Sequence, residues 1–211
     1  MSIPKLICFD LGGVLVRLDP LSAQRKFLSL APQHSETLER LLRDDFVHDQ
    51  EHFSENESFQ LGHLSTTEYF SRVRSIIGEQ HTDGQLKAAL LTVIVGDEPE
   101  TVRLLEPLSK IARLACFSNT HPLHWNYMLE SFAWMSSFEI QMASHLCRIA
   151  KPAPGAFRAI CEQAQLRSEE CLFIDDRLVN VEGARNIGMR AIQFQGPRAL
   201  IASLEAEGIF L

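Results

Sequence analysis

Near its start the chain reads Lys5-Leu-Ile-Cys-Phe-Asp-Leu-Gly-Gly13, a short apolar run that stops at an acid and a pair of glycines. The run over residues 5–9 predicts a buried strand, and the glycines predict a tight turn directly after it. Asp10 therefore stands at the carboxyl end of a buried strand. Ligands of open α/β sheets gather at that end, so this acid is the first candidate for a functional residue.

Three later apolar runs have the same character and also end in polar residues: 112–117, 171–174 and 190–194. Helix-like stretches lie between them, over 99–109, 153–164 and 179–187, the last of which closes on Gly188. Strands that alternate with helices are typical of parallel βαβ units. We therefore expect an α/β fold, a Rossmann-like parallel sheet with helices on both faces.

One stretch breaks this alternation. From about residue 18 to residue 93 there is little strand character, and apolar residues recur at helical spacing, as at Leu38 and Leu41. We interpret it as a small all-helical insertion after the first strand. The expected division is a core formed by residues 1–17 and 94–211, with residues 18–93 as a helical cap.

The composition excludes several classes of protein. With 211 residues, 45% hydrophobic and 22% charged, the chain is expected to be a soluble globular protein. A net charge of −7 argues against nucleic acid or an acidic membrane surface as partner, and no apolar run approaches the roughly 20 residues of a membrane span. Five cysteines without CxxC spacing are typical of buried, reduced thiols, so we expect a cytoplasmic protein.

Polar residues at four strand or loop ends belong together. They are Asp10, Ser118-Asn119, Lys151-Pro152 and Asp175-Asp176. A parallel sheet brings such ends to one edge, where three carboxylates would repel one another. A hard divalent cation such as Mg²⁺ takes oxygen ligands and offsets that repulsion.

Such a cation would also attract a phosphate group and shield its charge, which allows the Asp10 carboxylate to attack phosphorus as a nucleophile. Lys151 would neutralise the remaining phosphate charge, and Ser118 would donate a hydrogen bond to a phosphoryl oxygen. Each feature alone is weak. The set in this order predicts a phosphate-handling site.

The segments Phe9-Asp-Leu-Gly-Gly-Val14, Phe117-Ser-Asn-Thr120, Lys151-Pro152 and Phe173-Ile-Asp-Asp176 together make the chain resemble the haloacid dehalogenase-like (HAD) superfamily of phosphohydrolases. The likeness is greatest to the sugar-1-phosphate phosphatase-like subgroup with a helical cap. The resemblance implies that Asp10 is the nucleophile and forms an aspartyl-phosphate. It further implies Mg²⁺ beside Asp10, the backbone carbonyl of Gly12, Asp175 and Asp176, and phosphate binding by Ser118, Asn119 and Lys151.

Two positions depart from the family pattern. Most relatives carry a second Asp two positions after the nucleophile as general acid, and this chain has Gly12 there. We expect either a preference for substrates with better leaving groups or a replacement acid from Asp19, His121 or the cap. The second departure is Arg148, where relatives commonly have glycine, so we expect a rebuilt loop with the Arg148 side chain turned outward.

The predicted function is a Mg²⁺-dependent phosphomonoesterase for a small phosphorylated metabolite such as a sugar phosphate, working as a monomer or homodimer. The alternative is a catalytically weak or silent member that binds a phosphorylated ligand or a protein partner. A haloacid dehalogenase is a weaker hypothesis. A halide leaves without protonation, which suits Gly12, but the acids Asp175 and Asp176 then have no cation to bind.

A rival pattern is His48-Asp-Gln-Glu-His52, which fits the H-x-x-E-H motif of a zinc peptidase with His48, Glu51 and His52. That site needs a third protein ligand, and the simpler interpretation is a polar cap helix. His121 and His124 follow the Ser118 motif, and we expect surface or capping roles for them rather than catalysis.

Overall fold

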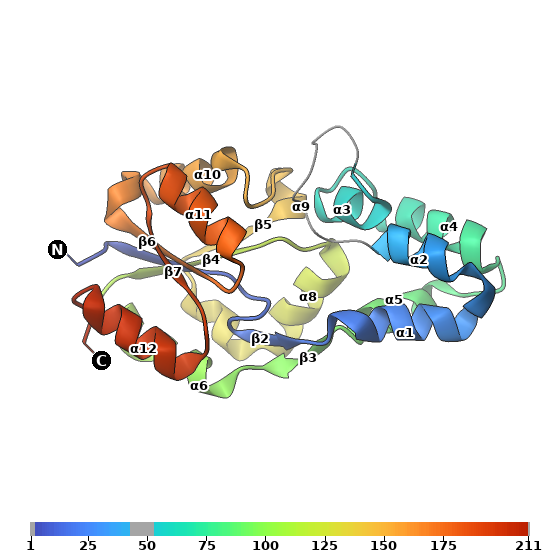
Figure 1. Ribbon diagram of the computed structural model, residues 1–211, viewed down its shortest axis with the longest axis horizontal. Helices are drawn as coiled ribbons and strands as arrows, with labels where there is room; N and C mark the ends of the chain where they lie inside the picture. The colour runs from blue at the N-terminus through green and yellow to red at the C-terminus, as the bar shows by residue number, and fades with distance from the viewer. Residues whose placement is uncertain (1–2, 43–52, 211) are drawn as a thin grey trace.

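The computed structural model describes residues 3–42 and 53–210 (Figure 1). Its main sheet has the order β5-β4-β1-β6-β7, and all neighbouring strands run parallel. The strands are β1 (Leu6–Phe9), β4 (Arg113–Ser118), β5 (Ile140–Ala143), β6 (Cys171–Asp175) and β7 (Arg190–Gln193). The expected Rossmann-like parallel sheet is thereby confirmed.

Alternate side chains of each strand point to opposite faces of the sheet. Apolar side chains therefore need cover on both faces, and helices provide it. In β1, Ile7 and Phe9 join one hydrophobic cluster while Leu6 and Cys8 join the other. The first cluster is completed by α7 (Leu105–Ser109), α8 (Pro122–Ser131) and α12 (Pro197–Ala206). The second is completed by α10 (Pro154–Ala164) and α11 (Leu178–Asn186).

A group of helices with its own hydrophobic cluster lies at one end of the sheet (Figure 1). These helices are α1 (Pro20–Leu30), α2 (Ser35–Leu42), α3 (Glu55–Gln60), α4 (Thr66–Ile77) and α5 (Asp83–Leu91). The aromatic side chains Phe27, Phe59, Tyr69 and Phe70 are buried among them. The antiparallel strands β2 (Val16–Leu18) and β3 (Ile94–Asp97) connect them to the sheet. We call α1 to α5 the helical segment.

Several elements differ from the sequence-based expectation. The predicted helix over residues 99–109 is instead two short helices, α6 (Pro99–Val102) and α7. The reason is Pro107, whose ring would clash with the carbonyl of residue 103 in a continuous helix but is tolerated in the first turn of a new one. The strands β2, β3 and β5 and the short helix α9 (Ser144–Cys147) were not predicted.

The expectation of buried, unpaired cysteines is met in part. All five cysteines are unpaired, and four of them are buried, whereas Cys147 is exposed. No helix among the residues that the structure describes is long and apolar enough to cross a membrane.

Candidate active site

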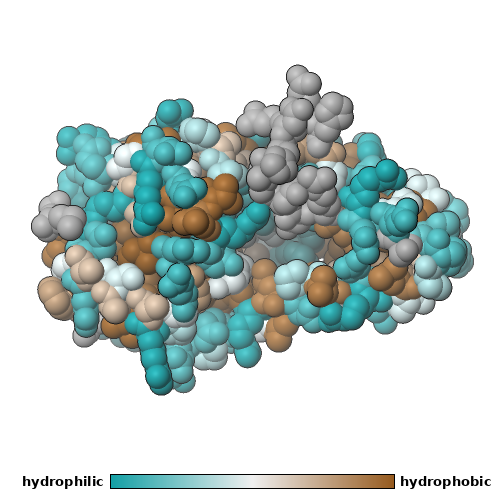
Figure 2. Space-filling model, viewed as in Figure 1, coloured by the Kyte–Doolittle hydropathy of each residue, from teal (hydrophilic) through white to brown (hydrophobic). Residues whose placement is uncertain are grey.

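A cleft of about 940 Å³ opens at the carboxyl ends of β1 and β4, between the sheet and the helical segment (Figure 2). Its sheet side is lined by residues that the sequence analysis singled out: Asp10, Gly12, Ser118, Asn119, Lys151 and Asp176. The remaining predicted site residue, Asp175, is fully buried behind Lys151. The structure thus brings all the predicted site residues to one place.

Lys151 is the centre of this arrangement. Its ammonium lies 2.9 Å from Oδ1 of Asp10 and 2.8 Å from Oδ2 of Asp175, and its side chain is only 1% exposed. The ammonium also lies over the rings of Phe117 and Phe173, at 5.7 and 5.2 Å from their centroids. Burial alone would lower the pKa of Lys151. The two carboxylates have a larger, opposite effect and raise this pKa above its ordinary value, so the side chain stays charged.

The two carboxylate oxygens of Asp10 have different surroundings. Oδ1 accepts hydrogen bonds from the Leu11 backbone N–H, at 2.7 Å, and from Lys151. No described residue forms a hydrogen bond with Oδ2, which leaves this oxygen free to act. Burial, to which the repulsion of Asp175 and Asp176 adds, outweighs the attraction of Lys151 and raises the pKa of Asp10 to about 8. Further positive charge at the site would lower this pKa and favour the ionised carboxylate of Asp10.

Asp175 and Asp176 follow each other in the chain but have different roles. Both oxygens of Asp175 are already occupied by hydrogen bonds from Lys151, the Arg177 backbone N–H and the Asn180 side-chain amide, at 2.8 to 3.0 Å. Asp176 is partly exposed to the cleft, and burial together with Asp175 raises its pKa. One oxygen each from Asp10, Asp175 and Asp176 lies within 4.8 Å of the others, a group able to hold a metal ion.

Gly13 leaves the space that the Asp176 carboxylate occupies. A Cβ atom at position 13 would lie 2.5 Å from Oδ2 of Asp176, and the backbone has φ of +76°, which favours glycine. The glycine turn predicted after β1 is therefore part of the acidic site itself.

The loops that follow β4 and precede α10 are held together by Asn119. Its side-chain amide donates to the Lys151 carbonyl at 2.8 Å, and its Oδ1 accepts from the Lys151 backbone N–H at 2.9 Å. These two hydrogen bonds position the Lys151 backbone, and phosphate binding by Asn119 stays a prediction. Ser118, at the end of β4, lines the cleft, and no described residue forms a hydrogen bond with its hydroxyl.

Arg148 ends α9 in the left-handed conformation that glycine favours, with φ of 56° and ψ of 30°. Its side chain is exposed, as expected. The expected rebuilding of the loop is not needed, because the arginine adopts the glycine-like backbone conformation directly.

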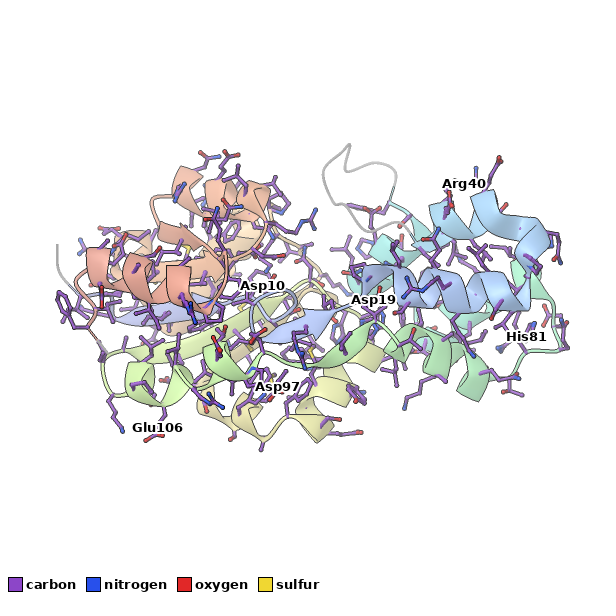
Figure 3. All side chains as sticks on the ribbon, turned by 60° about the horizontal axis from the view of Figure 1, so that its bottom comes forward. Asp10, Asp19, Arg40, His81, Asp97 and Glu106 are labelled. Carbon is purple, nitrogen blue, oxygen red and sulfur yellow. The ribbon has the colours of Figure 1, made fainter. Side chains whose placement is uncertain are left out.

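The candidates for a replacement acid lie in different places. Asp19 caps α1, forms an ion pair with Arg25 and is not part of the cleft lining; Figure 3 shows it at the start of α1, away from Asp10. His121 lines the cleft and caps α8 through Nδ1, so the expected capping role is confirmed. The expected surface position is wrong, since His121 is only 2% exposed.

The helical segment contributes a polar wall that the sequence analysis missed. It includes Gln24, Asn56 and Gln60. No spacing rule marks polar residues on short helices as parts of a site, and only the packing of α1 and α3 beside the cleft places them there. The residues of the zinc peptidase pattern, His48, Glu51 and His52, lie outside the described residues.

The comparison with protein families is consistent with this geometry. A family model described as "Hydrolase: haloacid dehalogenase-like hydrolase" matches residues 4–188. The chain belongs to the haloacid dehalogenase-like hydrolase family.

Individual relatives are named as phosphatases. The D-ribitol-5-phosphate phosphatase of Bacteroides thetaiotaomicron is 26% identical over 195 residues, which make up 90% of this chain and 91% of that protein. A phosphatase of Mycobacterium tuberculosis is 39% identical over 64 residues, 30% of each chain.

Solved structures show the same architecture. A HAD family enzyme of Bacteroides thetaiotaomicron, in complex with magnesium and inorganic phosphate, superposes with a TM-score of 0.78 at 25% identity, covering 90% of this chain and 93% of that one. The L-2-haloacid dehalogenase of Xanthobacter autotrophicus shares the fold, with a TM-score of 0.61 at 17% identity and coverage of 99% and 84%.

Proposed function

We propose that this protein is a Mg²⁺-dependent phosphomonoesterase that acts on a small phosphorylated metabolite, such as a sugar phosphate, through an aspartyl-phosphate on Asp10. The observation that carries the proposal is the free Oδ2 of Asp10 beside the buried Lys151 ammonium at the end of a cleft. The D-ribitol-5-phosphate phosphatase among the relatives supports a sugar or polyol phosphate as substrate.

The nucleophile is oriented by two groups. The Leu11 N–H and the Lys151 ammonium hold Oδ1 of Asp10, so the carboxylate is fixed with Oδ2 available for attack on phosphorus. The Lys151 ammonium and the Ser118 hydroxyl then bind phosphoryl oxygens and stabilise the charge that develops on them. Asn119 contributes by fixing the Lys151 backbone.

The donor set suits Mg²⁺, because it consists of carboxylate oxygens close enough to share one ion. Asp10, Asp176 and the Gly12 carbonyl would hold the ion directly. Asp175, whose oxygens are already bound, would act mainly by holding Lys151 and by adding negative charge. A bound Mg²⁺ would supply positive charge that shields phosphate from the carboxylates.

Residue 12 is glycine, so no aspartate at this position can protonate the leaving group. Asp19 is engaged with Arg25 outside the cleft lining. We therefore expect faster turnover of phosphate esters with better leaving groups, such as anomeric phosphates, than of simple alkyl phosphates.

The helical segment would serve as the cap, with residues 1–17 and 94–211 as the core and residues 18–93 as the cap. Its separate hydrophobic cluster and its two connections through β2 and β3 support this division. A cap over the strand ends excludes bulk water from the reaction and selects the leaving group. A monomeric or homodimeric state and a cytoplasmic location stay predictions.

The experiment is a phosphate-release assay on p-nitrophenyl phosphate and a panel of sugar phosphates, with and without Mg²⁺. We expect Mg²⁺-dependent release that is lost in Asp10→Asn. The control is Asp97→Asn, at a carboxylate of β3 outside the cleft lining, which should retain activity (Figure 3). No release by the parent protein would favour the silent, ligand-binding alternative.

A further inference from the structure

Gln60, at the end of α3, belongs to the lining of the cleft and carries a buried acceptor without a partner. The side chain lines the cleft and the residue is only 4% exposed. Its Oε1 atom is buried and has no hydrogen-bond partner among the described residues. Buried polar atoms in native proteins are nearly always satisfied, because an unpaired one is costly. Oε1 is shielded from water as the side chain lies, so a rotation of the Gln60 amide toward the cleft would bring it to a partner that arrives with the ligand.

His121 supplies the complementary donor. Its Nδ1 accepts a hydrogen bond from the His124 backbone N–H at 3.3 Å. Burial lowers the pKa of His121 well below its ordinary value, and the neighbouring His124 and His145 add to the effect. The ring is therefore neutral, and because Nδ1 is an acceptor, its single proton is on Nε2. No described residue forms a hydrogen bond with that nitrogen.

Two contacts bring Gln60 and His121 to the same part of the wall. The ring of Phe59, the residue before Gln60, is stacked on the His121 ring with centroids 4.7 Å apart and planes 13° apart. The Ser144 hydroxyl donates to the Gln60 carbonyl at 2.6 Å and accepts from the Thr120 backbone N–H at 2.9 Å. The helical segment and the loop after β4 are thus fastened together at this point.

We propose that Gln60 and His121 form a subsite for one hydroxyl group of the leaving alcohol. The hydroxyl donates to Oε1 of Gln60 and accepts from the N–H at Nε2 of His121. This inference rests on the proposed function and narrows its substrate class to phosphate esters of small polyhydroxylated compounds. Plain alkyl esters leave both groups unpaired in the closed site, which is how such a site rejects them.

The test compares two substrates that differ only in their hydroxyl groups, a pentitol 5-phosphate and pentyl phosphate. The measured quantity is the ratio of their kcat/KM values in the parent protein, in Gln60→Met and in His121→Asn. Met keeps the approximate size of Gln without its polar atoms, and Asn keeps a side-chain oxygen able to cap α8 without the Nε2 donor. We expect a ratio well above ten in the parent and a fall of at least tenfold in either variant.

Thermal unfolding provides the second measurement. Gln60→Met should unfold at the same temperature or a higher one, because it removes an unpaired buried acceptor, whereas loss of a merely structural glutamine would lower the transition. The matched control is Thr101→Val, which removes another buried, unpaired oxygen from a residue outside the cleft lining. It should leave the substrate ratio unchanged.

The outcomes separate this inference from the proposed function. Hydrolysis of p-nitrophenyl phosphate without a preference for the pentitol ester, or an unchanged ratio in both variants, overturns the subsite alone. No Mg²⁺-dependent hydrolysis of any of the three esters overturns the proposed function and the subsite with it.

Discussion

Lys151 and Asp10 form an ion pair that is almost closed to water: Nζ lies 2.9 Å from Oδ1, and the two side chains are 1% and 11% exposed. The same ammonium is 2.8 Å from Asp175, so one cation serves two carboxylates. Buried charges of this kind are tolerated only while their partners remain in place. The Lys151 side chain is therefore required for stability, in addition to the phosphate binding that we propose for it.

Replacing Lys151 with methionine should destabilise the fold by about 3 to 5 kcal/mol, because two buried carboxylates lose their counter-ion. Phosphate release should fall together with stability. Urea unfolding measures the first effect and steady-state kinetics the second. Lys110→Met, which breaks the exposed pair between Lys110 and Glu106, is the control and should leave the free energy of unfolding almost unchanged. Equal losses for the two variants would contradict this account of Lys151.

Gly13→Ala should disable the acidic site. The new Cβ would lie 2.5 Å from Oδ2 of Asp176, and alanine is strained at a φ of +76°. We expect less Mg²⁺-dependent phosphate release and a loss of about 1 kcal/mol or more in unfolding free energy. Gly84→Ala is the matched control, because Gly84 lies inside α5 with ordinary space around it, and it should be neutral or stabilising. Retention of full Mg²⁺-dependent activity in Gly13→Ala would show that Asp176 does not need this space.

The buried histidines beside the cleft should lower stability on mild acidification, and the raised pKa of Asp10 acts in the opposite direction. Burial lowers the pKa of His124 to about 4 and that of His121 well below its ordinary value. The unfolded chain takes up protons on these rings below about pH 6.5 while the folded protein does not, so the contribution of the neutral rings to stability is complete above that pH and falls toward pH 4. The upper limit is about 1.4 kcal/mol per ring for each pH unit within this window.

Urea unfolding between pH 7.5 and 4.5 checks this prediction. His124→Gln keeps a donor for the Leu90 carbonyl, 2.9 Å from Nε2, but cannot take up a proton, so its stability should decline less steeply. His81→Gln, at a distant turn between α4 and α5, should follow the parent curve (Figure 3). A parent-like slope in His124→Gln would rule out the buried ring as the cause.

Gly12→Asp should speed the hydrolysis of simple alkyl phosphates at least tenfold, because it supplies the general acid that position 12 lacks. The only close contact of a Cβ there is Cδ1 of Leu18, at 2.7 Å. Leu18 is 40% exposed, so its side chain has room to turn away. Gly12→Asn has nearly the same size but cannot donate a proton in this way, and it should bring no gain. Equal rates for the Asp and Asn variants would disprove the role of acid catalysis.

The strongest elements of the fold were predictable from sequence because their signals are local. β1, with all four residues buried, is a continuous apolar run, and β4 and β6 have the same character. β5 was missed because Ile140-Gln-Met-Ala143 is a short edge strand interrupted by a polar residue. The β2–β3 pair depends on contacts between residues far apart in the chain, which no local pattern records.

For the candidate site, residue types and their order along the chain predicted which residues lie close together. They did not predict which atoms form hydrogen bonds with one another. The sequence indicated Asn119 as a phosphate ligand, and only the three-dimensional contacts show both ends of its amide on the Lys151 backbone. Gln60 carried no signal at all, because the role that we propose for it depends on a buried, unpaired atom of a residue in the cleft lining.

The central place of β1 in the sheet has a consequence for the order of events during synthesis. β1 pairs only with β4 and β6, so the strand that carries Asp10 has no partner until residues 113–118 have been made. The helices of the helical segment precede both partners in the chain and pack against one another. As the chain leaves the ribosome, the helical segment can therefore fold early, while Asp10 and Asp175 come together only after residues 171–175 emerge. A nascent chain that stops short of β6 carries Asp10 but has no assembled acidic site.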